Sequence, residues 1–333
     1  MVTIKEIAKR VGVSVGTVSK VLNFNGTVGK NNRDKIIKTI KELNYRPNRI
    51  ARSLSKGKTK NIGFIIPDIK NPFFPEIVRG ASDVLMSDGY YVFLCSSDND
   101  PNKEDLYIND LISMWIDGII IAPSDTENRD INIFNNIISP FVVVDREIKG
   151  LEKDLVIINN KKGAYNAVSY LIENGHKKIV VLAGSKYTKT AQNRLAGWKM
   201  AMEERSLFKE EFVFFGDFSI ESGYKMIKEV FNRLGLVDAV FACDDLIALG
   251  AIQAIEEKGY KIPDNISIVG FDDIYLSRFL KPPLTTVKQP IYEIGKIAAE
   301  ILLDRINNPE EFSPKKIVVE GNLIFRESVK RKN

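Results

Sequence analysis

The chain has 333 residues, of which 44% are hydrophobic, so it is long enough to form two or three domains with substantial cores. Its two cysteines, Cys95 and Cys243, lie inside apolar runs, which argues against a disulfide framework and fits a reducing compartment. No signal-peptide pattern opens the chain, and no segment approaches the roughly 18 apolar residues that span a membrane. We therefore expect a cytoplasmic protein without a membrane partner.

Charge is unevenly distributed along the chain. The net charge is +5, but residues 1–60 contain 15 Lys and Arg against three acidic residues, a balance of +12. The remaining residues contain 33 basic and 40 acidic side chains, a balance of −7. A basic head on an acidic body is typical of a protein whose head alone meets phosphates. A solvated basic tail would carry the same charge, but it would lack the apolar periodicity of this segment.

Residues 1–47, called the head below, predict three short helices. Thr3 followed by Glu6 is a capping-box pattern, and it starts a helix over about residues 4–10. Gly12 permits a sharp turn, and Ser14 would cap a second helix from about residue 15 to 23. A third helix over about residues 32–43 is predicted by the apolar stripe of Ile36, Ile37, Ile40 and Leu43.

Two helices joined by a short turn at Gly12 form the pattern of a helix-turn-helix, whose second helix lies in the major groove of DNA. A three-helix module that binds another protein has the same outline. The positive charge of the head favours DNA over that alternative. We therefore expect an all-α DNA-binding domain at the amino terminus.

Two segments, VTIKEIAKRVGVSVGTVSKVLN at residues 2–23 and LNYRPNRIARSL at residues 43–54, closely resemble the DNA-binding region of the lactose-repressor/galactose-repressor family. The resemblance implies that Val15, Gly16 and Lys20 occupy the base-reading positions. Gly16 has no side chain to read a base, so Lys20 would carry the direct readout, with guanine as its expected partner. The family's phosphate-contacting positions are occupied by Thr3, Ser14, Thr17, Ser19 and Asn23.

The basic segment from Asn48 to Lys56 resembles the hinge helix that the family inserts into the minor groove. The resemblance places Asn48, Ala51 and Leu54 at the DNA, with Leu54 as the apolar wedge between base steps. A plain linker helix with Leu54 packed on the body is the alternative. The expected domains are residues 1–47 for the helix-turn-helix, 48–60 for the hinge helix and linker, and 61–333 for the effector-binding and dimerisation body.

From residue 61 the pattern changes to short apolar runs that alternate with amphipathic helices. Parallel βαβ units explain this alternation, and they place ligands at the carboxyl ends of the strands. The expected fold class is α/β for the body, behind an all-α head. The runs are NIGFIIP, YYVFLC, DGIIIAP, FVVVD, KKIVVLAG, DAVFAC and ISIVGF.

The body also resembles the family's periplasmic-binding-protein-like core, through the motifs NPFF, VDR, RLAGW, DDLIALG, VGFDD and PLTTVKQP. The resemblance implies two doubly wound parallel-sheet lobes joined by three crossovers, near residues 158–161, 288–291 and 320–323. Lobe 1 would then comprise about residues 61–159 and 290–321. Lobe 2 would comprise about residues 160–289 and 322–333.

Several of these motifs are more similar to ribose-binding protein and the ribose repressor than to the purine repressor. Aromatic faces cover the C–H face of a sugar ring, Asp accepts from its hydroxyls, and Arg or Asn donates to its oxygens. Ala122 and Asp244 each replace an Asn of ribose-binding protein, so the sugar class is better supported than ribose itself. The implied sugar-contacting residues are Asn71, Phe73, Phe74, Asp145, Arg146, Arg194, Phe218, Asp244, Asp272 and Gln289.

Eight of the ten implied sugar contacts also have a structural alternative. The plainer roles are core packing for Phe73 and Phe74, ion pairing for Asp145, Arg146 and Arg194, helix capping for Asp244, a solvated loop for Asp272, and satisfaction of backbone groups for Gln289.

No catalytic constellation is evident. His176 is the only histidine, which leaves a His-based triad unsupported, and one histidine with two separated cysteines argues against zinc. We expect no enzyme, no cofactor and no metal site. The hypothesis is a homodimeric transcriptional repressor that binds operator DNA under the control of a pentose-like sugar, with a purine-responsive regulator of the same family as the alternative. The sequence does not identify a protein corepressor.

Overall fold

The computed structural model describes residues 2–22, 27–45, 58–310 and 313–332. The chain forms two compact units, Met1–Thr59 and Lys60–Asn333. The hinge helix predicted within residues 48–56 lies outside the described residues, and so do Asn23, Asn48, Ala51 and Leu54.

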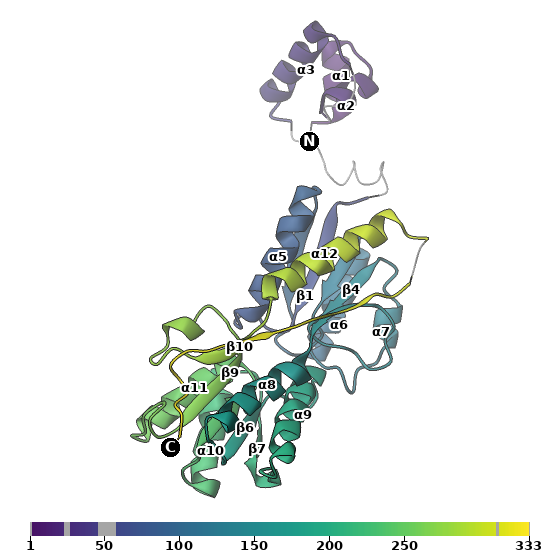
Figure 1. Cartoon of the computed structure of the whole chain (residues 1–333). Coiled ribbons are helices and arrows are strands. Elements are labelled where there is room, and N and C mark those ends of the chain that lie inside the picture. Colours follow the sequence, from purple (N-terminus) through teal and green to yellow (C-terminus); the bar gives the residue numbers. More distant parts are fainter. Residues whose placement is uncertain (1, 23–26, 46–57, 311–312, 333) are drawn as a thin grey trace. The chain divides into compact units, whose positions relative to one another are not determined.

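The first unit contains the three expected helices, α1 (Ile4–Val11), α2 (Val15–Leu22) and α3 (Lys30–Glu42) (Figure 1). Thr3 caps α1 in a complete capping box with Glu6, and Gly12 ends it with φ 76°, a left-handed conformation that glycine adopts without a steric cost. Fully buried Ile7, Val18 and Ile36 join the helices into one small core.

One expectation for α3 is wrong. Ile37 is exposed rather than part of the apolar stripe, and Thr39 is buried in its place. The reason is helical geometry: positions 36, 39, 40 and 43 share one face, whereas residue 37 lies about 100° away from residue 36.

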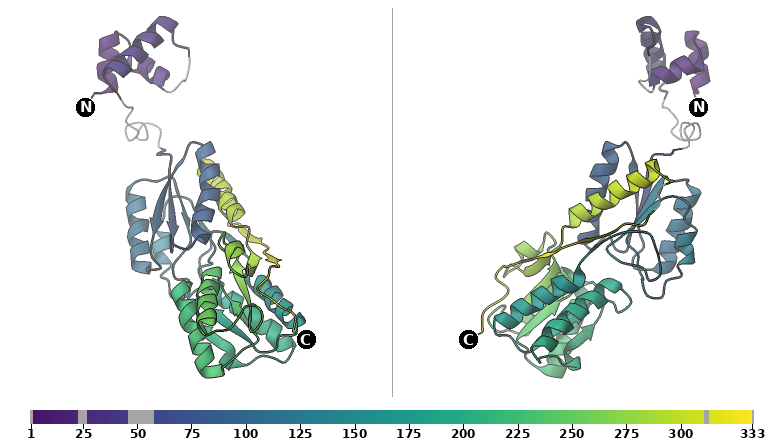
Figure 2. Two further views of the ribbon diagram at one scale, coloured as in Figure 1. Left: turned by 90° about the vertical axis from the view of Figure 1, so that its left-hand side faces the viewer. Right: turned by 45° about the vertical axis from the view of Figure 1, so that its right-hand side comes forward.

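The second unit contains two six-stranded sheets, each in its own lobe (Figures 1 and 2). In lobe 1, α5 and α12 share one hydrophobic cluster with the sheet, and α6 and α7 contribute to a second cluster formed by other residues of the same strands. The sheet order is β11-β5-β4-β3-β1-β2. The bounds are β1 (Asn61–Ile66), α5 (Phe73–Ser87), β2 (Tyr91–Ser96), α6 (Pro101–Ser113), β3 (Gly118–Ile121), α7 (Asn132–Asn135), β4 (Phe141–Val144), β5 (Asp154–Ile158), α12 (Ile291–Asn307) and β11 (Lys316–Val319).

In lobe 2, α8 packs on α9 and α10 packs on α11, and the sheet order is β12-β10-β9-β8-β6-β7. All strand pairs are parallel except β10 with β12, which is antiparallel. The bounds are α8 (Asn160–Glu173), β6 (Ile179–Ala183), α9 (Lys189–Glu204), β7 (Val213–Phe215), α10 (Ile220–Leu234), β8 (Ala239–Ala242), α11 (Asp245–Glu257), β9 (Ser267–Asp272), β10 (Thr285–Lys288) and β12 (Asn322–Ile324).

The chain passes between the lobes three times, from β5 to α8, from β10 to α12 and from β11 to β12. The expected fold class, a helix-turn-helix ahead of two parallel-sheet α/β lobes, is confirmed. In the parts of the chain that the structure describes, no helix combines the length and hydrophobicity that crossing a membrane requires.

Candidate functional site

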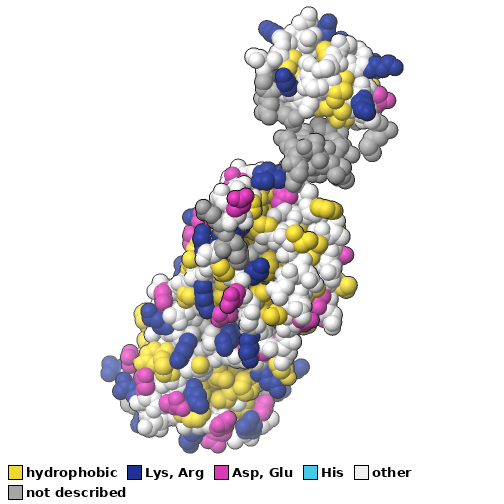
Figure 3. Space-filling model, turned by 90° about the vertical axis from the view of Figure 1, so that its right-hand side faces the viewer, with side chains coloured by type: hydrophobic (Ala, Val, Ile, Leu, Met, Phe, Trp, Pro, Cys, Tyr) yellow, Lys and Arg dark blue, Asp and Glu magenta, His cyan; other side chains and the backbone are white. Residues whose placement is uncertain are grey.

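The outer face of α2 presents the residues expected to read DNA. Val15 is 41% exposed, and Gly16 and Lys20 are also exposed. The Oγ of Ser14 accepts a hydrogen bond from the backbone N of Thr17 at 3.1 Å, which caps the start of the helix. On the face that Figure 3 shows, basic side chains predominate over the described part of the head, whereas both signs are interspersed over the body. This face therefore offers short polar groups and positive charge.

In the body, nine of the ten expected sugar-contacting residues line one cavity between the lobes. Its volume is about 20 Å³, which is room for about one water molecule. Thr190 is an additional lining residue that the sequence did not indicate, although it lies one helical turn before Arg194 on α9. The nine are Asn71, Phe73, Phe74, Asp145, Arg146, Arg194, Phe218, Asp244 and Asp272.

Most of these residues follow the carboxyl ends of parallel strands. Phe73 starts α5 after β1, Asp145 and Arg146 follow β4, Asp244 precedes α11 after β8, and Asp272 ends β9. Parallel strands end at one edge of a sheet, so the two lobes present these ends to a common cleft. Asp145 and Asp272 have φ values of 64° and 114°, a conformation that is strained for a residue with a side chain and concentrates at functional sites.

Asn71 bridges the lobes. Its Oδ1 accepts from the backbone N of Phe73 at 3.0 Å, and its Nδ2 donates to Oδ2 of Asp244 at 3.2 Å. The other oxygen of Asp244 accepts from the backbone N of Leu246 and Ile247 and so caps α11. Asp244 therefore combines the capping role with a position in the cleft.

Arg146 lies between aromatic residues of both lobes. Its guanidinium carbon is 5.7 Å from the ring centroid of Phe74 and 5.8 Å from that of Phe218. Nη1 donates to two backbone carbonyls, and Nε lies 3.3 Å from Oδ2 of Asp145 without a hydrogen-bond partner of its own. Burial lowers the pKa of Arg146, while Asp145 and Glu104 raise it.

Arg194 holds the lobe 2 side of the cleft. Its Nε donates to Oδ1 of Asn160 at 2.8 Å, its Nη1 donates to the carbonyl of Cys243, and its Nη2 lies 3.2 Å from Oδ1 of Asp272. The guanidinium also lies 3.9 Å from the ring centroid of Phe271. The side chain is 3% exposed, so the buried charge is matched by a carboxylate and several acceptors.

Burial raises the pKa values of Asp145, Asp244 and Asp272, and repulsion by Asp244 and Asp245 adds to the increase for Asp272. The cavity thus contains three carboxylates and two guanidinium groups. Gln289 is the tenth expected residue and does not line the cavity, but its Nε2 donates to Asp272 at 2.5 Å. Its Oε1 is buried without a hydrogen-bond partner.

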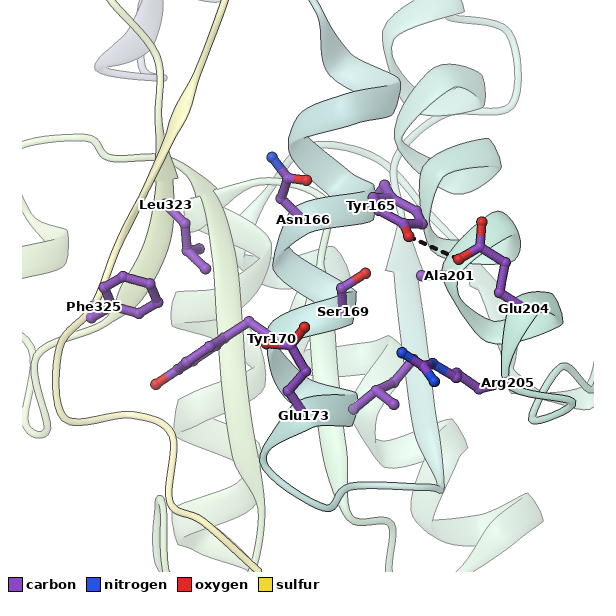
Figure 4. A pocket seen from close by; sticks show the side chains of 11 residues that line it. Tyr165, Asn166, Ser169, Tyr170, Glu173, Ala201, Glu204, Arg205, Leu323 and Phe325 are labelled. Carbon is purple, nitrogen blue, oxygen red and sulfur yellow. Dashed lines mark hydrogen bonds between the residues drawn. The ribbon is translucent and has the colours of Figure 1, made fainter.

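A larger hollow of about 350 Å³ lies on lobe 2, away from the cleft (Figure 4). Tyr165 donates a 2.8 Å hydrogen bond to Glu204 at its edge, and the ring centroids of Tyr170 and Phe325 lie 4.8 Å apart with the ring planes tilted by 56°. The hollow is open, and none of the residues expected to contact a sugar lines it. The small interlobe cavity, where the converging polar groups and strained residues lie, is therefore the candidate effector site.

The geometry defines a class of protein: a helix-turn-helix followed by two parallel-sheet lobes around a polar cleft, as in periplasmic-binding-protein-like domains. The model of the family described as "periplasmic binding protein-like domain" matches residues 168–329, and that of "bacterial regulatory proteins, lacI family" matches residues 3–48. The "HTH-type transcriptional repressor PurR" of Actinobacillus pleuropneumoniae serotype 3 (strain JL03) is 38% identical over 335 residues, and the alignment covers 100% of each of the two chains. The chain belongs to the lacI family of bacterial regulatory proteins; it is a transcriptional repressor and not an enzyme.

Two solved structures extend the comparison. The lac repressor dimer bound to operator and the anti-inducer ONPF superposes with a TM-score of 0.88 at 26% identity, over 99% of each chain. A lacI-family regulator from Enterococcus faecium with bound ribose gives a TM-score of 0.74 at 30% identity, over 82% of this chain and 100% of that one. The family assignment made from the sequence is confirmed.

Proposed function

We propose that the protein is a homodimeric repressor that binds an operator through α2 and the segment after the head, and that a pentose-like sugar in the interlobe cavity releases it. The proposed sugar effector rests on one observation. Nine residues that the sequence predicts to contact a sugar converge on one buried cavity. Operator binding places the protein in the cytoplasm.

The chemistry of the cavity supports a polyhydroxylated ligand. Carboxylates accept from hydroxyl groups, guanidinium and amide groups donate to ring and hydroxyl oxygens, and Phe rings pack on C–H faces. With three carboxylates and two guanidinium groups, a ligand rich in hydroxyl donors fits better than an anion. The Enterococcus faecium relative with bound ribose shares the fold at 30% identity.

The size of the cavity supports a link between the sugar and lobe movement. A volume of about 20 Å³ is far below what a pentose occupies, so the lobes or their side chains must move for one to enter. The Asn71–Asp244 hydrogen bond, which joins the lobes, is then exchanged for bonds to the sugar. A sugar that prefers the rearranged lobes thereby shifts the protein away from the operator-binding state.

A purine-responsive repressor is the second candidate, because PurR relatives are 38% identical over the whole chain. Phe73, Phe74 and Phe218 could also stack on a planar base. Hypoxanthine, however, brings fewer N–H donors to the three carboxylates than a pentose brings hydroxyl donors.

Titration of a labelled operator decides between the two candidates. The operator is first selected from random duplexes with the full chain. Ribose or another pentose should release it at micromolar to millimolar concentration, and hypoxanthine or guanine should leave it bound. If only a purine released the operator, the effector would be a base instead of a sugar. If no sugar or sugar phosphate changed operator binding, the proposed sugar effector would be refuted.

The proposed DNA contacts follow the order of the head. Val15, Gly16 and Lys20 would face base edges, while the hydroxyls of Thr3, Ser14, Thr17 and Ser19 would donate to phosphates. Asn23, Asn48, Ala51 and Leu54 belong to the same proposal and lie outside the described residues. Removing Lys20 by Lys20→Ala should relax the preference for one base pair at a cost of about 1 to 3 kcal/mol in operator binding.

A further inference from the structure

A buried carboxylate outside the cavity, Glu104 of α6, is bound at both oxygens. Its side chain is 0% exposed. Oε2 accepts from the backbone N of Ser124 at 2.8 Å and from its hydroxyl at 2.7 Å, while Oε1 accepts from Nη2 of Arg129 at 3.0 Å. Burying such a charge costs several kcal/mol in desolvation, which these partners must offset. Glu104 therefore fixes the conformation of the loop that follows β3.

That loop, residues 122–127, in turn fixes Arg146. Nη1 of Arg146 donates to the backbone carbonyls of Pro123 at 3.0 Å and Ser124 at 3.1 Å. The hydroxyl of Ser124 is also 2.7 Å from that of Ser97, which closes the network against β2. The guanidinium that faces the cavity is thus oriented by carbonyls whose own positions depend on Glu104.

The same loop contacts lobe 2 directly through Thr126, which is 0% exposed. Its Oγ1 accepts from the backbone N of Lys189 at 2.9 Å, and its backbone N donates to the carbonyl of Tyr187 at 3.3 Å. Lys189 is the first residue of α9, the helix that carries Thr190 and Arg194. The same loop therefore both orients Arg146 and contacts lobe 2.

We propose that Glu104 is a positioning residue of the cavity: it holds residues 122–127 in the conformation that orients Arg146 toward the ligand and keeps Thr126 against lobe 2. The inference rests on the proposed sugar effector. A glutamine at this position keeps one acceptor oxygen but turns an N–H donor toward the backbone N–H of Ser124 or the guanidinium of Arg129, which are themselves donors. The loop then relaxes, and Arg146 loses its orientation.

Glu104→Gln in the full chain tests the inference, and Asp110→Asn, an exposed acid of the same helix, is the matched control. In isothermal titrations with ribose, E104Q should bind about tenfold more weakly than the wild type, because the mispaired buried amide no longer holds the loop that orients Arg146. D110N should bind as the wild type does. Operator affinity without sugar should stay within about twofold of the wild type in D110N.

A double-mutant cycle with Arg146→Lys separates positioning from a loss of stability, because residues that act through each other are not additive. In the R146K background, E104Q should change ribose affinity by less than about twofold. If E104Q binds ribose as tightly as the wild type, or if it still loses tenfold in the R146K background, the positioning role is refuted and the proposed sugar effector is not affected.

Ser124→Ala removes only the hydroxyl between Glu104 and Ser97, and it replaces E104Q if that variant does not fold. A loss of about threefold in ribose affinity is expected for S124A, and unchanged binding contradicts the inference. If the wild-type chain binds no sugar, the proposed effector fails and the positioning role fails with it, which is distinguishable from a failure of E104Q alone.

Discussion

At the residue scale, Arg194 joins three parts of lobe 2 through buried contacts, to Asn160, Cys243 and Asp272. Arg194→Met keeps much of the apolar stem but leaves Asp272 without its cation. Breaking a buried pair in this way should lower the free energy of unfolding by about 3 kcal/mol, measured by urea denaturation. Arg205→Met, at the exposed end of the same helix, should change it by less than about 0.5 kcal/mol. Equal stability of the two variants would contradict the role given to the ion pair.

Asp245, next to Asp244, should make the free energy of unfolding depend on pH. It is fully buried and accepts from the backbone N of Ile274 and the hydroxyls of Ser277 and Thr286. Burial raises the pKa of Asp245 from 3.8 to about 7. Between these values the folded state binds more protons than the unfolded state, so stability falls as pH rises through this window.

Asp245→Asn removes this titration. Between pH 5 and pH 8 the wild type should lose about 2 to 3 kcal/mol of unfolding free energy relative to D245N, because one pKa unit corresponds to about 1.4 kcal/mol. Urea denaturation of both proteins at the two pH values measures the difference. A wild type that gains stability over D245N as pH rises would show that the carboxylate is better partnered when charged than when neutral.

The sequence predicted most of the cavity but few of the residues that support it. The family resemblance implied ten sugar contacts, and nine of these residues meet in one place. Glu104 and Thr126 gave no such signal, because an acid on α6 and a threonine in a loop acquire meaning only from groups far along the chain, Ser124 and Lys189. Gln289 was expected to line the cavity and lies behind Asp272 instead.

At the element scale, the capping box of α1 is a local device whose contribution is measurable. Oγ1 of Thr3 accepts from the backbone N of Glu6 at 3.3 Å, and Glu6 accepts from the backbone N of Thr3 at 2.7 Å. Thr3→Ala should cost about 1 kcal/mol, which corresponds to about fivefold faster amide exchange in α1. Hydrogen exchange with mass spectrometry on the full chain checks this, with the exposed Thr27→Ala as control. Equal exchange of α1 in both variants would mean that the box does not limit fraying.

Helices with caps and strands within clear apolar runs were predictable, whereas five other strands were not. The helices of the head begin and end within two residues of expectation, because Thr3, Gly12 and Ser14 act locally. The strands β5, β7, β10, β11 and β12 were not among the seven predicted runs. They contain three to five residues each, and β11 and β12 are edge strands that receive their pairing from distant segments.

At the scale of the whole molecule, the two edges of the lobe 1 sheet differ in a way that bears on the proposed dimer. The edge strand β2 exposes Tyr91, Phe93 and Leu94. The opposite edge strand, β11, begins with Lys316, a charge of the kind that discourages edge pairing. Tyr91 and Phe93 lie on one face of the sheet and Leu94 lies on the other, so exposed apolar side chains flank this edge, as at an interaction site. The β2 edge is therefore the surface that we expect a second copy to cover.

Phe93→Asp should dissociate the proposed dimer with little change in the stability of the fold, since Phe93 is 46% exposed. Val318→Asp on β11 is the matched control, because Val318 is 47% exposed on the other edge of the same sheet. Sedimentation velocity should show monomers for F93D and dimers for V318D. Since two linked heads gain about a hundredfold or more in avidity over one, F93D should also lose at least that factor in operator affinity. If both variants were dimers, the interface would not lie at β2. If the wild type were a monomer that binds its operator tightly, the proposed dimer would be refuted.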